Sequence, residues 1–221
     1  MEDKQNPEKR KIFKEKLSEY LKITKESPER LQVWFWDESG FSLRVIRRKT
    51  WGKKGRRKKV TGQRRRGRVN IMGGLRYHDK KRINFVIKKG DADVFYEQLT
   101  LLYNSCRQEW VEQGNKIEFF NDCAAKIVII LDNASFHKRK DILEKIEKEM
   151  PNIILEFLPP YSPDYNLIEL VWHSAKEYIA HRIFDSVEQL EELLNKLLNQ
   201  GGLIIKWDRK IKNKGNAVYS I

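Results

Sequence analysis

Three carboxylates stand at the ends of apolar runs or at an expected helix start, and these residues have the clearest capacity for joint chemistry. Asp37 closes the apolar run Leu31–Trp36, and Asp132 closes the β-branched run Lys126–Leu131. Glu169 follows a proline-rich turn and falls in the first turn of an expected helix. A lone buried carboxylate is costly to keep. We therefore expect the three carboxylates to share a partner that compensates their charge.

Carboxylates that share a cleft repel one another and hold protons unless a cation neutralises them. Oxygen ligands with no His or Cys beside them favour Mg²⁺, for which Mn²⁺ can substitute, over zinc. Two such ions, roughly 3.5–4 Å apart, can activate an attacking oxygen and stabilise the leaving oxygen of a phosphodiester. We therefore interpret Asp37, Asp132 and Glu169 as both metal ligands and catalytic residues for in-line phosphoryl transfer.

Each acid also has a plain structural interpretation. Asp37 could simply terminate a strand, and Asp132 could form a turn by bonding its own backbone. Glu169 could complete a capping box that begins at Asn166. Glu38 is excluded as a ligand because neighbouring strand residues point to opposite faces of a sheet. Taken singly, these structural interpretations are favoured, so the catalytic one depends on a fold that brings the acids together.

A strongly basic window lies between Arg44 and Arg68, with fourteen Lys or Arg and no acid. The net charge is +14, and the rest of the chain is balanced, with 31 basic and 31 acidic residues. One very basic element on a balanced domain favours a polyanion such as nucleic acid, and the family resemblance described below implies double-stranded DNA. We expect DNA contacts from the following residues of the window: Arg47, Arg48, Lys49, Trp51, Lys53, Lys54, Arg56, Arg57, Lys58, Lys59, Arg64, Arg65, Arg66 and Arg68.

Other candidate DNA contacts flank the acids. His137 and Lys138 follow Asp132, and His173 and Lys176 follow Glu169 at i+4 and i+7 of the expected helix. A surface role is equally open for His137 and Lys138. Trp51 could stack on a base, wedge at a DNA end or contact a partner subunit, but packing onto its own domain is an equal alternative.

The elements that must position these residues follow from periodicity. Residues 1–30 predict a charged amphipathic helix or linker, residues 31–200 a catalytic domain, and residues 201–221 a basic tail. Ser39-Gly40 predicts a turn or bulge before an antiparallel strand at Phe41–Val45, and the basic window then forms a β-hairpin insertion between strands two and three. Five strands, three antiparallel and two separated by helices, with acids on the first and fourth, give an α/β, ribonuclease-H-like mixed sheet flanked by helices.

Composition limits the remaining classes. The hydrophobic content of 40% supports one sizeable domain, and the two cysteines form no metal spacing. No apolar run approaches the roughly 20 residues of a membrane span, and the charged N-terminus lacks an apolar signal core. We expect a cytoplasmic protein associated with the nucleoid.

Three motifs carry a resemblance to a known family: Trp36–Phe41, Leu131–Lys138 and Leu158–Asp164, the last followed by Asn166, Ile168, Glu169 and Trp172. They resemble the catalytic domain of mariner-type insertion-sequence transposases, in the DDE transposase and integrase superfamily. The resemblance covers roughly Leu31 to Ile183. It implies a triad of Asp37, Asp132 and Glu169 that holds two Mg²⁺, hydrolytic cutting at element ends, and joining of the 3′-hydroxyl to target DNA, typically at TA.

Two departures from the family pattern qualify the resemblance. Leu167 stands where the family usually has proline, and only about thirty residues precede the expected domain, where the family places helix-turn-helix domains. The chain therefore resembles a catalytic half, and a separately encoded N-terminal DNA-binding half is a possible partner. We expect a homodimer on DNA, because two element ends must be processed together. The alternatives are a catalytically silent, DNA-binding remnant that regulates or inhibits a full-length partner, and another nuclease of the same fold.

Overall fold

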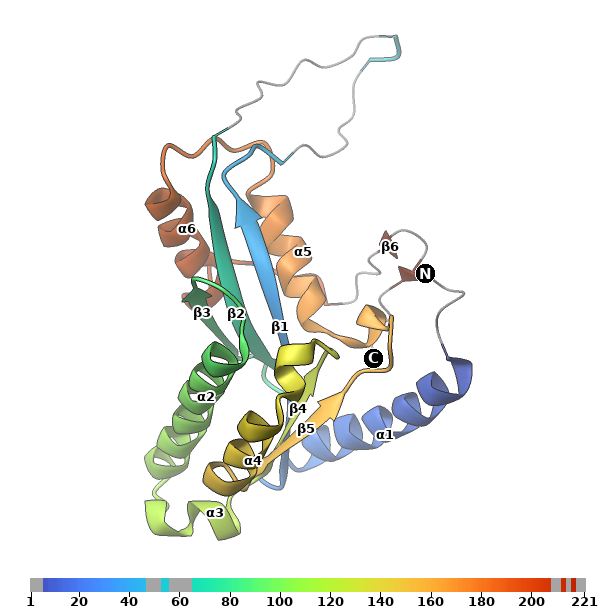
Figure 1. The fold of residues 1–221 in the computed structure, drawn as a ribbon, viewed down its shortest axis with the longest axis vertical. Coiled ribbons are helices and arrows are strands. Elements are labelled where there is room, and N and C mark those ends of the chain that lie inside the picture. Colours follow the sequence, from blue (N-terminus) through green and yellow to red (C-terminus); the bar gives the residue numbers. More distant parts are fainter. Residues whose placement is uncertain (1–5, 47–52, 56–64, 208–211, 214–215, 218–221) are drawn as a thin grey trace.

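The computed structural model describes residues 6–46, 53–55, 65–207, 212–213 and 216–217. Its centre is a five-stranded mixed sheet in the order β3-β2-β1-β4-β5 (Figure 1). The strands are β1 (Leu31–Ser42), β2 (Arg68–Arg76), β3 (Arg82–Ile87), β4 (Lys126–Leu131) and β5 (Ile153–Phe157). The pairs β1–β2 and β2–β3 are antiparallel, whereas β1–β4 and β4–β5 are parallel. The predicted fold class, a mixed sheet flanked by helices, is confirmed.

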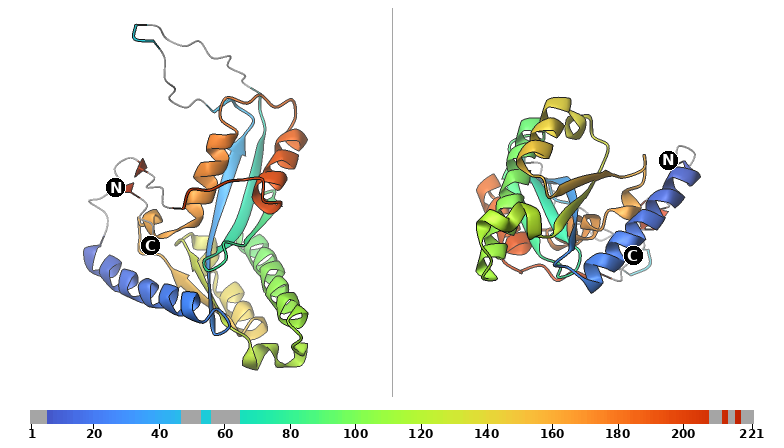
Figure 2. Two further views of the ribbon diagram at one scale, coloured as in Figure 1. Left: turned by 180° about the vertical axis from the view of Figure 1, so that it is seen from behind. Right: turned by 90° about the horizontal axis from the view of Figure 1, so that it is seen from below.

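Helices cover both faces of this sheet (Figure 2). The α-helices are α1 (Pro7–Glu26), α2 (Ala92–Glu112), α3 (Phe120–Cys123), α4 (Lys140–Glu149), α5 (Ile168–Tyr178) and α6 (Val187–Asn199). Short 3₁₀ turns are η2 (Ile117–Phe119), η3 (Ser135–Lys138) and η4 (Pro163–Tyr165). A small antiparallel pair, β6 (Lys212–Asn213) and β7 (Asn216–Ala217), lies in the expected basic tail.

The alternation of β1 divides the core into two clusters. Val33 and Phe35 pack with residues of α1, α5 and α6 on one face. Trp34 and Trp36 pack with residues of α2 and α4 on the other. All four side chains are fully buried, because a strand covered by helices on both faces must be apolar on both. The alternation consequently directs Asp37 to the face of Val33 and Phe35, and Glu38 to the opposite face.

The N-terminal helix α1 is part of the domain. Its apolar residues Phe13, Leu17 and Leu21 are buried in the cluster with β1, as the amphipathic pattern predicts. Asn6 caps the helix by accepting a hydrogen bond from the backbone N–H of Lys9 at 3.0 Å. Among the described residues, no helix is both long enough and apolar enough to cross a bilayer.

Two predictions about the first strands are wrong. Ser39 and Gly40 form no turn or bulge: β1 runs unbroken to Ser42, with Gly40 opposite Asn70 and Phe41 opposite Val69. The basic window consequently lies between β1 and β2, not between the second and third strands. Gly40 leaves room for the Arg68 side chain, which lies where a β-carbon would stand, and the strand pairs with β2 on both sides of this glycine.

Candidate active site

Asp37, Asp132 and Glu169 line one cavity of about 500 Å³. Its remaining wall is the proline-rich turn after β5, together with two asparagines; the lining residues are Asn133, Ala134, Leu158, Pro159, Pro160, Tyr161, Ser162, Pro163 and Asn166. The three acids therefore come from a strand, a strand end and a helix start that are far apart in the sequence. The structure brings together all three acids that the sequence singled out.

Asp37 lies within β1, opposite Gly73 of β2, and not at the end of the strand. It stands two residues beyond the Phe35–Ile130 pair, and Asp132, directly after the parallel strand β4, stands two residues beyond the same pair. Its Oδ2 accepts a hydrogen bond from the Trp172 indole at 3.1 Å, so its side chain faces α5. Burial, and then the negative charge of Glu169, raises the pKa of Asp37 well above its ordinary value.

Glu169 lies in the first turn of α5, directly after the proline-rich turn. The alternative that Glu169 completes a capping box with Asn166 is wrong. The Asn166 amide instead donates to the backbone carbonyl of Trp36 at 3.1 Å, and Leu167 is the N-cap residue of α5, which has no side-chain cap. This buried bond fixes the start of α5 beside Asp37. Burial raises the pKa of Glu169, and the positive charge of Lys176 opposes that rise.

Asp132 differs from the other two acids in its environment. Its Oδ1 accepts hydrogen bonds from the Ala134 backbone N–H at 2.9 Å and from the His137 ring at 3.0 Å. The bond from His137 is the main reason that the pKa of Asp132 lies below its ordinary value. The cavity thus combines an acid that ionises readily with two that resist ionisation, a separation of pKa values typical of reactive sites.

His137 does not fit its predicted role as a DNA contact. Its side chain is buried in η3 and lies between two carboxylates, with Nε2 at 3.2 Å from Glu38 Oε1. Burial opposes its positive charge, but the bonds to Asp132 and Glu38 outweigh that effect and raise the pKa of His137 to about 9. Glu38 does face away from Asp37, as predicted, yet it reaches Asp132 through this ring. The period-2 rule placed the Glu38 side chain correctly, but it carries no information about a bridging residue 99 positions away.

Arg10 supports the site, although the sequence analysis gave it no role. Its guanidinium bonds both Asp164 oxygens, at 3.0 and 2.6 Å, and the Ser162 hydroxyl at 2.6 Å. It also lies over the Tyr165 ring at 4.6 Å. The N-terminal helix therefore anchors the turn that delivers Glu169, a contact that joins residues more than 150 positions apart.

The other predicted DNA contacts fall into three groups. Lys53, Lys54, Arg66 and Arg68 are exposed. Arg65 is held by its own chain, with an ion pair to Asp185 at 3.0 Å and bonds to the carbonyls of Phe184 and Asp185. The remaining residues of the window lie outside the described part of the chain: Arg47, Arg48, Lys49, Trp51, Arg56, Arg57, Lys58, Lys59 and Arg64.

Three further candidates lie near the acids. Lys138 is exposed, bonds the Asn133 side chain and lies over the Phe157 ring at 4.7 Å. His173 pairs with Glu177 at 3.2 Å within α5. Lys176 lies 5.7 Å from the centre of the Phe41 ring and lowers the pKa of Glu169 by its charge. Lys138 and Lys176 therefore place positive charge near the carboxylate cavity.

The carboxylates suit a hard divalent cation in their chemistry. Oxygen donors alone line the acidic part of the cavity, and a cation there would relieve the repulsion that raises the pKa of Asp37. Within the described residues, however, no three His, Cys, Asp or Glu side chains are already arranged to coordinate one ion. Asp132 has its Oδ1 turned to His137 and the Ala134 N–H. The ligand types therefore fit a metal, whereas the side chains would have to adjust to close around it.

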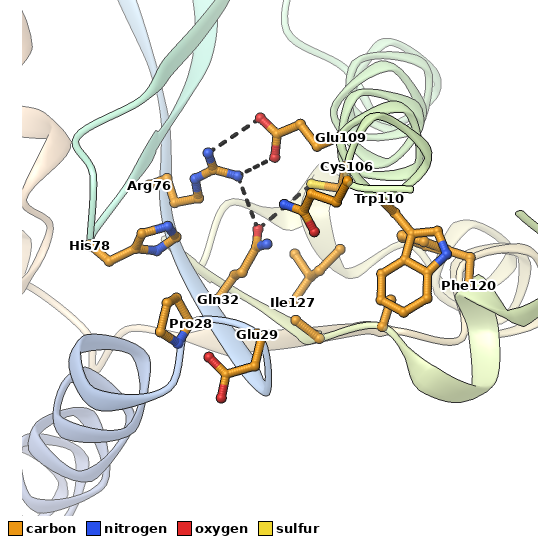
Figure 3. A pocket seen from close by; sticks show the side chains of 13 residues that line it. Pro28, Glu29, Gln32, Arg76, His78, Cys106, Glu109, Trp110, Phe120 and Ile127 are labelled. Carbon is orange, nitrogen blue, oxygen red and sulfur yellow. Dashed lines mark hydrogen bonds and ion pairs between the residues drawn. The ribbon is translucent and has the colours of Figure 1, made fainter. Parts of the chain in front are cut away.

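A second cavity, of about 400 Å³, lies beside Gln32, near the start of strand β1 (Figure 3). Its arginine, Arg76, is neutralised within the chain by Asp79 and Glu109, and it also bonds the Gln32 side chain at 3.4 Å. Cys106 in its wall has a pKa raised to about 12 by burial, so the thiol stays protonated. This cavity presents a satisfied ion-pair network, and the carboxylate cavity is the better candidate for chemistry.

Comparisons with known proteins bear on the family and the fold of the chain. The family model described as DDE superfamily endonuclease matches residues 32–191. A curated relative, the uncharacterized protein y4pE/y4sA of Sinorhizobium fredii (strain NBRC 101917 / NGR234), is 38% identical over 84 residues, which are 36% of this chain and 58% of that protein. The chain thus spans little more than half of this relative.

Solved structures show the same fold. The Mos1 strand transfer complex gives a TM-score of 0.62 at 16% identity, over 87% of this chain and 54% of that one. The catalytic domain of Mos1 mariner transposase gives 0.56 at 16% identity, over 87% of this chain and 82% of that one. The ribonuclease-H-like fold that the sequence predicted is thereby confirmed.

Proposed function

Because the chain belongs to the DDE superfamily of endonucleases, we propose that it is the catalytic domain of a mariner-type insertion-sequence transposase. It cuts phosphodiester bonds at element ends and joins the 3′-hydroxyl to target DNA at a TA dinucleotide. The observation that carries the proposal is the cavity where Asp37, Asp132 and Glu169 meet. Burying three acids from separate elements in one cavity lowers the stability of the fold, since two of them resist ionisation, so a function of the site best accounts for the arrangement.

In this proposal the triad holds Mg²⁺, or Mn²⁺ in its place. The similar Mos1 mariner paired-end complex has been described with Mg and with Mn. Bound cations would supply Lewis acidity at the scissile phosphodiester. The chain contributes orientation: the Trp172 indole holds Asp37, the Asn166 amide fixes the start of α5 beneath Glu169, and the bonds to Oδ1 hold Asp132.

Exposed basic residues supply the affinity for DNA in this proposal. Phosphate contacts come from Lys53, Lys54 and Arg66 between β1 and β2, from Arg68 at the start of β2, and from Lys138 beside the cavity, and these contacts carry no sequence information. Selection of element ends requires contacts to base edges in addition, because phosphate contacts do not read sequence. Two copies of the chain act together, since two ends are joined, and the similar Mos1 structures include a paired-end complex with the left transposon end.

One experiment tests the activity. The chain is incubated with Mg²⁺ and labelled duplexes taken from the DNA that flanks its coding sequence, and with supercoiled plasmid as a substrate that needs no end recognition. Native protein should nick or cut, and Asp132→Asn should lose about a hundredfold or more of that rate, the scale expected for losing one group that stabilises transition-state charge. Asp122→Asn, an exposed acid outside the cavity, is the matched control.

The outcomes separate the alternatives. Cutting by native chain and by Asp122→Asn, but not by Asp132→Asn, supports the enzyme. Salt-sensitive DNA binding by all three with cutting by none identifies the silent remnant that acts as a regulator. Cutting that survives Asp132→Asn overturns the assignment of the site.

A further inference from the structure

A bridge of hydrogen-bonded side chains lies behind Asp132. His137 follows Asp132 by five residues, in the 3₁₀ turn η3, and its two ring nitrogens face two different carboxylates. Nδ1 lies 3.0 Å from Asp132 Oδ1, and Nε2 lies 3.2 Å from Glu38 Oε1. The bridge therefore connects the end of β4 to the face of β1 that points away from Asp37.

The ring of His137 is held so that it cannot serve as a mobile group. Its side chain is only 1% exposed. Phe136 and Phe95 pack against the ring, with centroid distances of 4.2 and 4.6 Å. Ionised carboxylate oxygens only accept hydrogen bonds, so the ring donates from both nitrogens. A buried ring with both donors engaged and two aromatic neighbours fixes the direction of each bond that it makes.

We propose that Glu38 and His137 are positioning residues: Glu38 orients the His137 ring, and the ring in turn sets the orientation in which Asp132 presents its carboxylate to the cavity. The proposal rests on the proposed role of Asp132 in holding a divalent cation. Outer partners that orient a ligand in this way commonly change metal affinity by about 10–100-fold when they are removed.

The alternative explanation is that His137 is a core histidine whose hydrogen bonds are all made and which is needed only for packing. Two substitutions separate the explanations because each keeps one donor. Asparagine has its amide near the position of Nδ1, so His137→Asn can still donate to Asp132. Glutamine has its amide near the position of Nε2, so His137→Gln can still donate to Glu38 but not to Asp132. A packing role gives no reason for these two variants to differ in metal affinity.

The measurement is Mn²⁺ affinity of the full chain by electron paramagnetic resonance titration, with the midpoint of thermal unfolding recorded for every variant. His137→Gln and Glu38→Leu should each weaken Mn²⁺ binding by about tenfold or more. His137→Asn should stay within about threefold of native, and Glu38→Gln should do the same because its amide oxygen still accepts from Nε2. Leu194→Val, at a buried position of α6 in the other core cluster, should lower the unfolding midpoint and leave affinity unchanged.

Two failures are distinguishable. If the native chain binds no Mn²⁺, the proposed metal-dependent function fails, and the positioning role fails with it. If the native chain binds Mn²⁺ but His137→Gln and His137→Asn bind it equally, or affinity falls in proportion to the unfolding midpoint across all variants including Leu194→Val, the positioning role is overturned and the proposed function stands.

Discussion

Trp172 donates its indole N–H to Asp37 Oδ2 across 3.1 Å, which ties the acid of β1 to the helix that carries Glu169. Trp172 itself is buried and packs edge-on against Phe41 at 6.3 Å. The indole therefore holds Asp37 from a rigid position, one helical turn beyond Glu169. The two acids are kept together although burial disfavours the charge of both and the charge of Glu169 further disfavours that of Asp37, so the site is held at a cost in stability.

That cost predicts that Asp37→Asn stabilises the metal-free chain. The folded-state pKa of Asp37 is raised well above 3.8, mainly by burial, so the folded state holds this proton more tightly than the unfolded state. Native stability consequently falls as pH rises from about 4 through the folded-state pKa. The variant keeps an oxygen for Trp172 and has no charge, so it should gain about 0.5–2 kcal/mol at neutral pH.

Urea unfolding in EDTA, from mildly acidic to mildly alkaline pH, checks this result. The difference between Asp37→Asn and native should shrink as pH falls, because protonation removes the charge from the native acid as well. Asp122→Asn, at an exposed position, should follow the native curve. A variant that is less stable than native at every pH would show that the charge of Asp37 does not lower the stability of the folded state.

Divalent cations should offset the loss of stability that the buried charge of Asp37 causes. Ions that bind the folded state alone stabilise it by mass action, by about 2.7 kcal/mol at a free concentration one hundred times Kd. Adding Mn²⁺ to EDTA-treated, dialysed protein should therefore raise the unfolding midpoint of the native chain. The rise should be much smaller in Asp37→Asn and unchanged in Asp122→Asn. Equal rises in all three would place the ion outside the carboxylate cavity.

The sequence predicted the parts of the site that depend on one element each. The apolar runs before Asp37 and Asp132, and the proline-rich turn before Glu169, are local signals with a single physical meaning. Gly40 misled the prediction because glycine signals a turn by itself, whereas here a distant arginine fills the space beside it. The bridge from Glu38 to His137 was out of reach for a related reason, since it depends on two strands and a 3₁₀ turn being packed together.

The ion pair between Arg10 and Asp164 was not predicted from the sequence. It should contribute strongly to the free energy of unfolding. Asp164 is 4% exposed and Arg10 19%, so removing the cation leaves a nearly buried carboxylate. Arg10→Met should cost about 3 kcal/mol, the low end of the range for breaking a buried pair. Asp164→Asn in the same background should restore much of the loss, because the uncompensated charge is gone.

A double-mutant cycle by urea unfolding measures this coupling. Lys16→Met is the control on the same helix: Lys16 pairs with Glu156 but is 48% exposed, so its loss should cost less than about 1 kcal/mol. Additive effects of Arg10→Met and Asp164→Asn would mean that the two residues do not interact energetically.

The salt dependence of DNA binding should separate two neighbouring arginines. Arg66 is exposed, whereas Arg65 already pairs with Asp185 and bonds the carbonyl of Phe184. Each phosphate contact contributes about 0.9 to the slope of log affinity against log salt. Arg66→Gln should therefore flatten the slope by about that amount, equally on two unrelated duplexes. Arg65→Gln should change the slope less and the unfolding free energy more. Arg107→Gln, exposed on α2, is the matched control. An unchanged slope in Arg66→Gln, measured by fluorescence anisotropy, would remove that residue from the DNA surface.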